Sequence, residues 1–287
     1  VGACGIAVRS IAPFVKSKKI DPAVVVVDEQ GQFAISLLSG HIGGANELTE
    51  EIAEILRAQP VITTATDLND KFAVDVFAKK NGCFISDMEL AKEISAALLA
   101  GKEVGFVSDF PWLGEIPDEL KLCQKEDEEK PEIGICVTTG YLEHPFVHTL
   151  YLIPRVITTG LGCKKGTDKE TVESVVRRAC DELLIPSVAM EQVASIDLKK
   201  EEAGILEYCK ERKIPFITYT AEELQEVEGT YASSQFVENV TGVDNVCERA
   251  ALLGSSKDGK GRLIQRKYAK DGVTVALAMK KWSVNFE

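Results

Sequence analysis

A glycine-rich turn near the N-terminus holds the side chain best suited to proton transfer. The segment 38–46 (LSGHIGGAN) lies between an apolar run and a helical pattern. His41 can gain or lose a proton near neutral pH, and backbone N–H groups at glycines and at a helix start favour anionic oxygen. A tight turn whose histidine is hydrogen-bonded or solvated explains the same residues about equally well. The spacing matches neither a Walker A loop nor a dinucleotide-binding fingerprint.

A second polar turn follows the next strand-like run. Residues 63–67 (TTATD) supply three hydroxyls and a carboxylate that could hydrogen-bond a polar ligand at a strand end. A turn that caps the following helix is the structural alternative, and the residues alone favour it. Arg9 could bind a carboxylate through its guanidinium group. For Arg9 too the plainer interpretation, a solvated surface side chain, is favoured.

The second half of the chain has a turn rich in glycine and lysine. Gly160–Thr167 (GLGCKKGT) places Lys164 and Lys165 among three glycines just before a helical pattern. Such a turn favours a bound anion. Cys163 is interpreted as a packing residue, because no histidine follows His148 to act as its local base.

Alternating strand and helix patterns must position these turns. In the first half, strands are expected at 22–27, 33–38, 60–64, 104–107 and 133–137, and helices at 45–57, 70–80 and 88–99. In the second half, strands are expected at 156–159, 214–219 and 273–279, and helices at 168–184, 198–212, 221–228 and 245–253. This order predicts an α/β protein with two α/β domains, mainly parallel sheets and Gly-rich turns at strand C-terminal ends. The domains are expected at 1–150 and 151–287, with 142–155 as the linker.

The composition argues against several classes of protein. The 287 residues are 45% hydrophobic and 27% charged, which is typical of a globular chain. A net charge of −12 argues against a nucleic-acid partner. The longest apolar run, 23–27, is far below the roughly 18 residues of a membrane span. No secretory signal opens the chain, so a cytoplasmic protein without a membrane partner is expected. No CxxC pair occurs among eight cysteines and there are three histidines, so no protein metal site is expected.

Together these motifs resemble the cobalt-precorrin-5A hydrolase family of anaerobic cobalamin biosynthesis. The likeness covers essentially the whole chain, keeps the family's motif order and is weakest over about 82–150. The residues on which the likeness rests are 2–5 (GACG), 21–26 (DPAVVV), 36–46 (SLLSGHIGGAN), 60–67 (PVITTATD), 160–167 (GLGCKKGT), Ser195, Lys199, Lys200, Gly204, 236–237 and 241–243. Family members carry a further strand and helix before the segment that opens this chain, so we expect that part to be missing here.

The resemblance implies a hydrolase that opens the δ-lactone of cobalt-precorrin-5A and releases acetaldehyde, giving cobalt-precorrin-5B. On this hypothesis the catalytic residues are His41 for proton transfer, Ser39 and Asn46 for developing negative charge, and Asp67 for orienting water. The anionic corrinoid would be bound by Gly40, Gly43, Gly44, Thr64, Thr66, Arg9, Gly160, Gly162, Lys164 and Lys165. No cofactor is expected, because the cobalt arrives inside the substrate.

Two other functions stay open from the residues. Glycine-rich turns in both halves also suit a non-catalytic corrinoid-binding or carrier protein, which would bind the lactone without converting it. A nucleotide-binding module is a weaker alternative, because the phosphate-binding spacings are missing. The sequence leaves a homodimer open.

Overall fold

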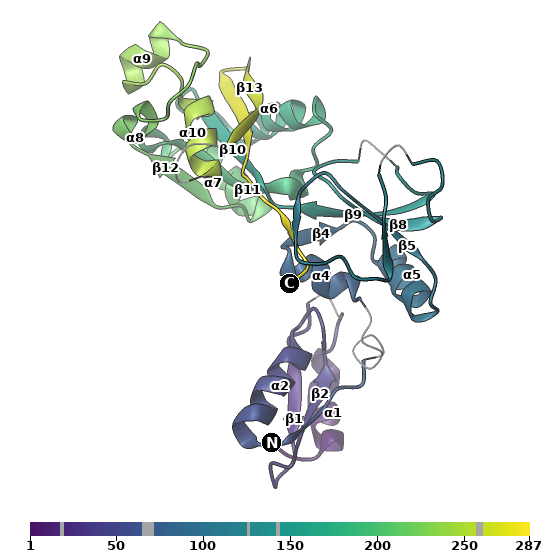
Figure 1. Ribbon diagram of the computed structural model, residues 1–287. Helices are drawn as coiled ribbons and strands as arrows, with labels where there is room; N and C mark the ends of the chain where they lie inside the picture. The colour runs from purple at the N-terminus through teal and green to yellow at the C-terminus, as the bar shows by residue number, and fades with distance from the viewer. Residues whose placement is uncertain (18–19, 65–71, 125–126, 142–143, 257–260) are drawn as a thin grey trace.

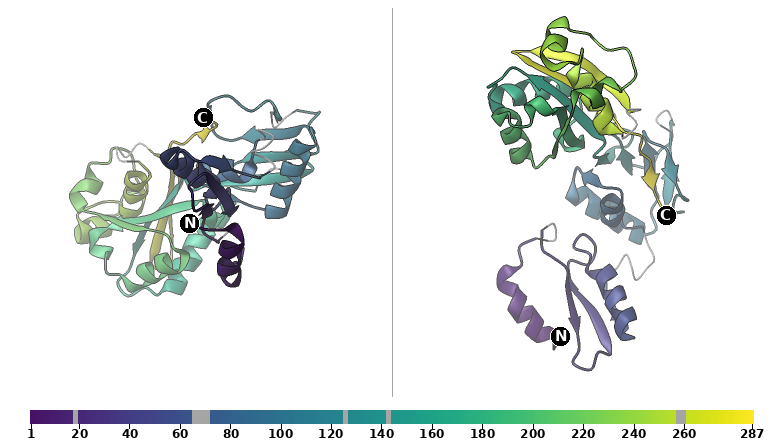
Figure 2. Two further views of the ribbon diagram at one scale, coloured as in Figure 1. Left: turned by 90° about the horizontal axis from the view of Figure 1, so that it is seen from below. Right: turned by 90° about the vertical axis from the view of Figure 1, so that its left-hand side faces the viewer.

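The molecule is built from three α/β units that follow one another along the chain. The structure, a computed structural model, describes residues 1–17, 20–64, 72–124, 127–141, 144–256 and 261–287. Figure 1 shows the N-terminal unit (1–61) at the bottom, the middle unit (74–154) in the centre and the C-terminal unit (157–279) at the upper left. The right-hand view in Figure 2 shows the same order. Each unit has a main sheet of its own.

The N-terminal unit is a three-stranded sheet with two helices. Its elements are α1 (Cys4–Ile11), the 3-10 turn η1 (Ala12–Phe14), β1 (Val24–Val27), β2 (Phe33–Leu38), α2 (Ala45–Leu56) and β3 (Gln59–Val61). β1 and β2 form an antiparallel hairpin, and β2 pairs parallel with β3. Because β2 and β3 are parallel, the loops that follow them leave from the same edge of the sheet. Those loops are the two polar turns of the sequence.

The middle unit is a five-stranded sheet with the strand order β4-β9-β8-β5-β7. Its elements are α4 (Val74–Lys80), β4 (Cys83–Ile85), α5 (Met88–Leu99), β5 (Val104–Ser108), β6 (Trp112–Leu113), β7 (Leu120–Leu122), β8 (Ile133–Val137) and β9 (His148–Pro154). β9, β8, β5 and β7 are paired in parallel, and β4 runs antiparallel to β9.

Part of the predicted linker 142–155 is a central strand. β9 occupies His148–Pro154, and its side chains from Leu150 to Pro154 are buried. The prediction of a linker was therefore wrong, because two prolines concealed a strand that is buried on both faces. The predicted domain boundary between 150 and 151 falls within this strand.

The C-terminal unit is a second five-stranded sheet, in the order β12-β11-β10-β14-β13. Its elements are β10 (Ile157–Cys163), α6 (Lys169–Asp181), η2 (Ser187–Ala189), β11 (Met190–Ile196), η3 (Asp197–Lys199), α7 (Ala203–Arg212), β12 (Phe216–Tyr219), α8 (Ala221–Gln225), α9 (Gln235–Thr241), α10 (Val246–Ser255), β13 (Arg262–Lys270) and β14 (Val273–Met279). β10, β11 and β12 are parallel, whereas β14 and β13 are antiparallel additions. The predicted α/β class is confirmed.

The residues after β14 return to the middle unit. In this C-terminal tail (280–287), β15 (Val284–Asn285) pairs parallel with β6. One apolar core runs from Phe77 of α4 to Leu277 of β14, so the middle and C-terminal units are packed together. That core contains no residue of 1–64 among those described. The N-terminal unit therefore meets the rest of the molecule without sharing its core.

Candidate active site

The predicted glycine-rich turn folds back on itself between β2 and α2. The N–H of Gly44 donates to the carbonyl of His41 at 3.0 Å, and the N–H of Ala45 donates to the carbonyl of Ser39 at 3.1 Å. Ser39 has a φ of +59° and Gly44 one of +85°. A β-carbon on Gly43 would lie 2.3 Å from the β-carbon of Ser39. Gly43 is therefore required by the packing of the turn, whether or not it also binds a ligand.

Asn46 ties the two polar turns together. The Ser36 hydroxyl donates to its Oδ1 at 2.6 Å, and its Nδ2 donates to the Thr64 hydroxyl at 3.0 Å. The side chain is 7% exposed, so these hydrogen bonds lie in a mostly buried setting. Gly40 makes room for this amide, since a β-carbon there would lie 2.7 Å from Oδ1 of Asn46. Asn46 thus holds Thr64 beside the turn.

His41 meets a carboxylate from the middle unit. Its Nδ1 lies 3.4 Å from Oδ1 of Asp75 in the first turn of α4, and the two side chains are 12% and 16% exposed. Lys79, one helical turn further on, donates from Nζ to the carbonyl of His41 at 3.4 Å. A carboxylate beside an imidazole orients the ring and stabilises its protonated form. The pair is therefore suited to proton transfer.

Two hollows meet at this pair, and both are lined by His41, Thr64 and Asp75. The first, of about 320 Å³, continues along α5 past Met88 and Leu99. The second, of about 350 Å³, follows the turn from Ser36 to Ile42. The Ser39 hydroxyl, which borders the second hollow, is buried without a hydrogen-bond partner among the described residues. We call the turn 39–44 with Asn46, Thr64 and Asp75 the His41 site.

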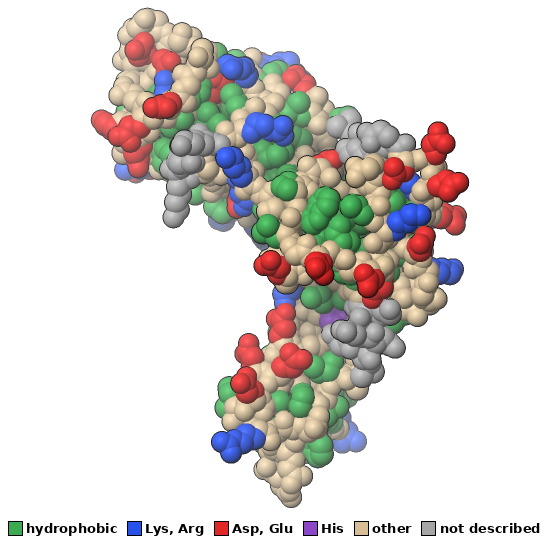
Figure 3. All heavy atoms as spheres, viewed as in Figure 1, with side chains coloured by type: hydrophobic (Ala, Val, Ile, Leu, Met, Phe, Trp, Pro, Cys, Tyr) green, Lys and Arg blue, Asp and Glu red, His purple; other side chains and the backbone are tan. Residues whose placement is uncertain are grey.

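The C-terminal unit has a larger cavity of about 760 Å³. Five lysines border it, namely Lys164, Lys165, Lys199, Lys267 and Lys270, and apolar side chains such as Ile196 and Val246 line it between them. Gly162 also borders this lysine cavity. Lysine and arginine side chains lie over the C-terminal unit in Figure 3, whereas acidic side chains gather along the outer edge of the middle unit. An acidic protein thus carries a local cationic site.

The predicted turn at Gly160–Thr167 is shorter than expected. β10 continues through Cys163, so the first half of the segment is strand. Gly160 is buried in that strand, where a β-carbon would lie 1.9 Å from the carbonyl oxygen of Cys247 in α10. It borders no part of the lysine cavity. Close packing of α10 on β10 accounts for this glycine, and its role in substrate binding stays a prediction.

A side chain of the protein already occupies part of the remaining turn. The N–H of Gly166 donates to the Glu202 carboxylate at 2.6 Å, and Nζ of Lys199 donates to the same carboxylate at 3.0 Å. Burial acts to raise the pKa of Glu202, but these two hydrogen bonds outweigh it and hold the pKa below its usual range. The turn thus accepts a carboxylate, as its sequence predicts.

Cys163 borders the lysine cavity, but the structure gives it no sign of nucleophilic activation. Burial is the largest influence on the thiol and raises its pKa, although Lys199 acts in the opposite direction. A thiol with a raised pKa stays protonated and unreactive near neutral pH. The raised pKa of Cys163 agrees with the packing role inferred from the sequence.

The comparisons with known proteins follow the same three units. The profile for Cobalamin synthesis G N-terminal matches residues 1–67, that for Cobalamin biosynthesis central region matches 72–154, and that for Cobalamin synthesis G C-terminus matches 157–278. Cobalt-precorrin-5A hydrolase of Salmonella typhimurium is 37% identical over 97% of this chain and 80% of its own length. The chain belongs to the cobalt-precorrin-5A hydrolase family.

Two further proteins are similar along most of the chain. Cobalt-precorrin-5A hydrolase of Priestia megaterium is 36% identical over 95% of this chain and 76% of its own length. A crystal structure of a cobalamin biosynthesis protein G homolog from Sulfolobus solfataricus is 24% identical. It covers 97% of this chain and 80% of that chain, with a TM-score of 0.38.

The structure brings together only part of the site expected for a cobalt-precorrin-5A hydrolase. Ser39, His41, Asn46 and Thr64 lie at one place, whereas Thr66 and Asp67 lie outside the described residues. Arg9 is exposed in the last turn of α1 and borders neither hollow. Sequence reasoning missed Asp75 and Lys79. An acidic residue in a first helical turn and a lysine in the last are ordinary helix features, so neither carried a signal of its own.

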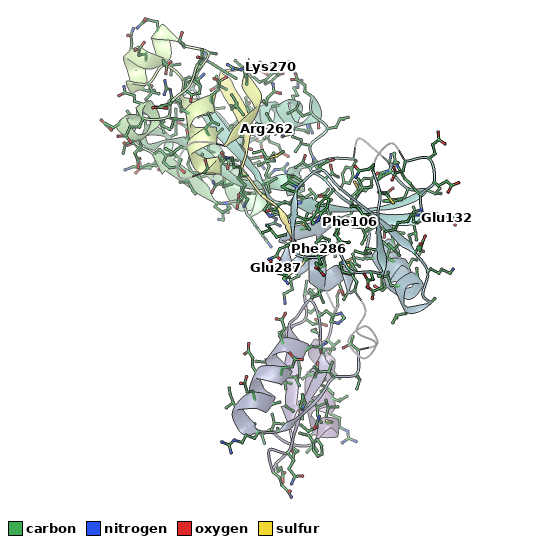
Figure 4. All side chains as sticks on the ribbon, viewed as in Figure 1. Phe106, Glu132, Arg262, Lys270, Phe286 and Glu287 are labelled. Carbon is green, nitrogen blue, oxygen red and sulfur yellow. The ribbon has the colours of Figure 1, made fainter. Side chains whose placement is uncertain are left out.

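The His41 site and the lysine cavity lie in different parts of the hydrolase. In Figure 1 and in the right-hand view of Figure 2 the middle unit lies between the N-terminal unit and the C-terminal unit. Lys270 is at the end of β13 that points away from the N-terminal unit in Figure 4. The two sites therefore share no lining residue. No helix in the described part is long and apolar enough to cross a membrane, and no cluster of three metal-binding side chains occurs there.

Proposed function

We propose that this protein hydrolyses the δ-lactone of cobalt-precorrin-5A and releases acetaldehyde, giving cobalt-precorrin-5B. Water adds to the lactone carbonyl, and the ester bond breaks to leave a carboxylate and a hydroxyl. The hydroxyl then loses its proton as its carbon becomes the aldehyde carbon. The carbon–carbon bond to the macrocycle breaks at that moment, and its electron pair passes to the macrocycle. One water is consumed for each acetaldehyde released.

His41 is proposed to move the protons of this reaction. Lactone opening needs a base for the attacking water, and the second step needs a base for the new hydroxyl. The imidazole lies where two hollows meet, with the Asp75 carboxylate 3.4 Å from Nδ1. With Nδ1 turned to Asp75, Nε2 is the nitrogen that we assign to proton transfer with the substrate. Asp75 would then orient the ring and stabilise the imidazolium, in the role of a positioning residue.

The polar groups around His41 are proposed to bind the reacting oxygens. The buried Ser39 hydroxyl has no partner among the described residues, so it can donate to a developing oxyanion. Thr64, fixed by Asn46, can orient water or the lactone. Asp67 and Thr66 are proposed to complete this side of the site. Asn46 has its described bonds within the protein, so we assign it to positioning rather than to oxyanion binding.

The lysine cavity is proposed as a second binding site, which would hold the carboxylates at the edge of a corrinoid. An apolar lining bordered by five lysines suits a flat apolar macrocycle with carboxylates at its edge. Lys164, Lys165 and Gly162 keep their expected role there. Arg9, which borders neither hollow, would contact only a substrate that extends over α1.

We infer that the protein needs no cofactor of its own, since cobalt enters with the substrate. All eight cysteines are free thiols, which supports a reducing compartment such as the cytoplasm. The absence of a nucleic-acid partner, expected from the net charge of −12, stays a prediction, as does the homodimer that the sequence leaves open.

The observation that carries this proposal is the His41–Asp75 pair at the meeting point of two hollows in a member of this family. The test is to incubate the chain with cobalt-precorrin-5A and follow the corrinoid by mass spectrometry. Loss of the two-carbon unit at a catalytic rate supports the hydrolase. Tight binding of an unchanged corrinoid would instead favour the carrier.

A further inference from the structure

The C-terminal tail reaches the helix that carries the partners of His41. After β14 the chain leaves the C-terminal unit and enters the middle unit, where β15 pairs with β6. The N–H of Val284 donates to the carbonyl of Pro111 at 2.9 Å, and the N–H of Phe286 donates to the carbonyl of Leu113 at 3.0 Å. Figure 1 shows this last strand ending beside α4. The tail is therefore an integral part of the middle unit.

Asn81 joins the end of α4 to the tail by two hydrogen bonds. Its Oδ1 accepts from the N–H of Asn285 at 2.7 Å, and its Nδ2 donates to the carbonyl of Asn285 at 3.0 Å. Nδ2 also donates to the carbonyl of Phe77, in the last turn of α4, at 3.0 Å. The side chain is 9% exposed, so these bonds are largely protected from water. Asn81 thus fixes both the end of the helix and the tail strand.

Phe286 supports the same helix by packing. Its ring is stacked on Phe77 of α4, with centroids 4.8 Å apart and planes at 30°. It also meets Phe106 of β5 edge-on at 5.3 Å. Figure 4 shows Phe286 beside Phe106 at the edge of the middle unit that faces the N-terminal unit. Offset and edge-on ring pairs favour a defined geometry beyond simple burial.

We propose that Asn81 and Phe286 are positioning residues for the His41 site. α4 has only seven residues, and it presents Asp75 to the imidazole of His41 and Lys79 to the carbonyl of the same residue. A helix of two turns contributes little stability alone, so its place is set by what packs on it. The tail packs on α4 through Phe77. Asp75 and Lys79 of the same helix contact His41 in the turn 39–44. The tail thereby sets the distance between Asp75 and His41.

This inference rests on the proposed function only where it predicts how the variants change turnover. The structural effect is measured separately, from the ring signals of the three histidines in a ¹H–¹³C NMR spectrum of the full chain, with the His41 signal assigned from His41→Gln. The variants are Phe286→Ala, Phe286→Leu and Asn81→Ala. Trp282→Ala is the matched control, because the ring of this partly buried tail aromatic pairs with Phe110, whereas that of Phe286 pairs with Phe77 of α4.

We expect Phe286→Ala and Asn81→Ala to shift or broaden the His41 signal and to leave the His148 signal unchanged. Trp282→Ala should leave both signals in place, and Phe286→Leu should restore most of the wild-type spectrum. In the turnover assay, the first two variants should lower kcat about 10- to 100-fold with little change in KM, because misplaced catalytic groups slow the reacting step. If Phe286→Ala does not fold, Asn81→Ala still decides the question.

The inference is overturned if the His41 signal of Asn81→Ala, or that of folded Phe286→Ala, matches that of the wild type. It is equally overturned if Trp282→Ala moves that signal as much as Asn81→Ala does. A wild-type chain that binds but does not convert the lactone, while its His41 signal responds as expected, would reject the proposed function and retain the coupling of the tail to the site.

Discussion

The Nδ1 atom of His41 lies 3.4 Å from Oδ1 of Asp75, although the two residues belong to different units of the chain. His41 belongs to a turn of the N-terminal unit, and Asp75 belongs to the first turn of α4 in the middle unit. The proposed base and its carboxylate partner therefore form a pair only when the two units are in contact. The site depends on the assembled chain.

Asp75→Asn should lower kcat about 10- to 100-fold and leave KM nearly unchanged. Asparagine keeps the shape of the side chain but removes the charge that stabilises the protonated ring and selects its tautomer. Steady-state kinetics with cobalt-precorrin-5A measures both constants. Asp118→Asn, at an exposed turn, is the control and should behave like the wild type. Equal kcat values in the two variants would remove Asp75 from the mechanism.

The double variant Lys164→Ala/Lys165→Ala should weaken corrinoid binding at the lysine cavity. Each exposed ion pair contributes about 0.2 to 1 kcal/mol, so the loss of two predicts a roughly two- to thirtyfold higher Kd. Binding of cobyrinic acid, a corrinoid polycarboxylate, can be followed by calorimetry at two salt concentrations. The variant should also show a weaker dependence on salt. Lys210→Ala on α7 is the control, and the proposal would be rejected if its Kd changed as much as that of the double variant.

The sequence predicted the local elements better than their assembly. The strands at 33–38 and 273–279 and the helix at 45–57 agree closely with β2, β14 and α2, because their apolar periodicity records which face is buried. β9 was missed, since a strand buried on both faces lacks the alternation that marks a half-buried one.

The candidate site was predictable only within one stretch of chain. Ser39, His41 and Asn46 share a nine-residue segment whose glycines and polar side chains stand out in the sequence. Asp75 is 34 residues beyond His41, and its approach depends on how the middle unit meets the N-terminal unit. Local sequence patterns do not predict a contact between two separate units. The tail contacts of Asn81, 204 residues from Asn285, were out of reach for the same reason.

Gly160→Ala should destabilise the C-terminal unit by about 3 kcal/mol. The new β-carbon would lie 1.9 Å from the carbonyl oxygen of Cys247 and 2.7 Å from the amide nitrogen of Ala251. Both are backbone atoms of α10, so the helix must move away from the sheet. Thermal unfolding measures the effect. Gly5→Ala in α1 is the control, since a β-carbon there meets nothing within 4 Å. Similar melting temperatures for the two variants would contradict this account of Gly160.

Glu202→Gln should destabilise the protein at pH 7 by about 1 kcal/mol, with a smaller effect in acid. The pKa of Glu202 is lower in the folded protein than the value of about 4.3 for a free side chain. The charged group therefore contributes stability above that value, and the contribution disappears as the pH falls through the folded pKa. Melting temperatures at pH 7 and pH 4 test this, with Glu207→Gln, an exposed change on α7, as the control. A loss of stability in Glu202→Gln that grows as the pH falls would contradict the stabilising role of the charged Glu202 carboxylate.

The central claim is that His41 transfers protons during hydrolysis of the lactone. The most direct test measures acetaldehyde released from cobalt-precorrin-5A by the wild type, by His41→Ala and by His148→Ala, together with corrinoid affinity. Loss of a general acid–base group predicts about 100- to 10,000-fold slower release in His41→Ala, with affinity nearly intact. His148, exposed at the start of β9, should be replaceable without effect. Acetaldehyde release by His41→Ala at the wild-type rate would contradict the mechanism.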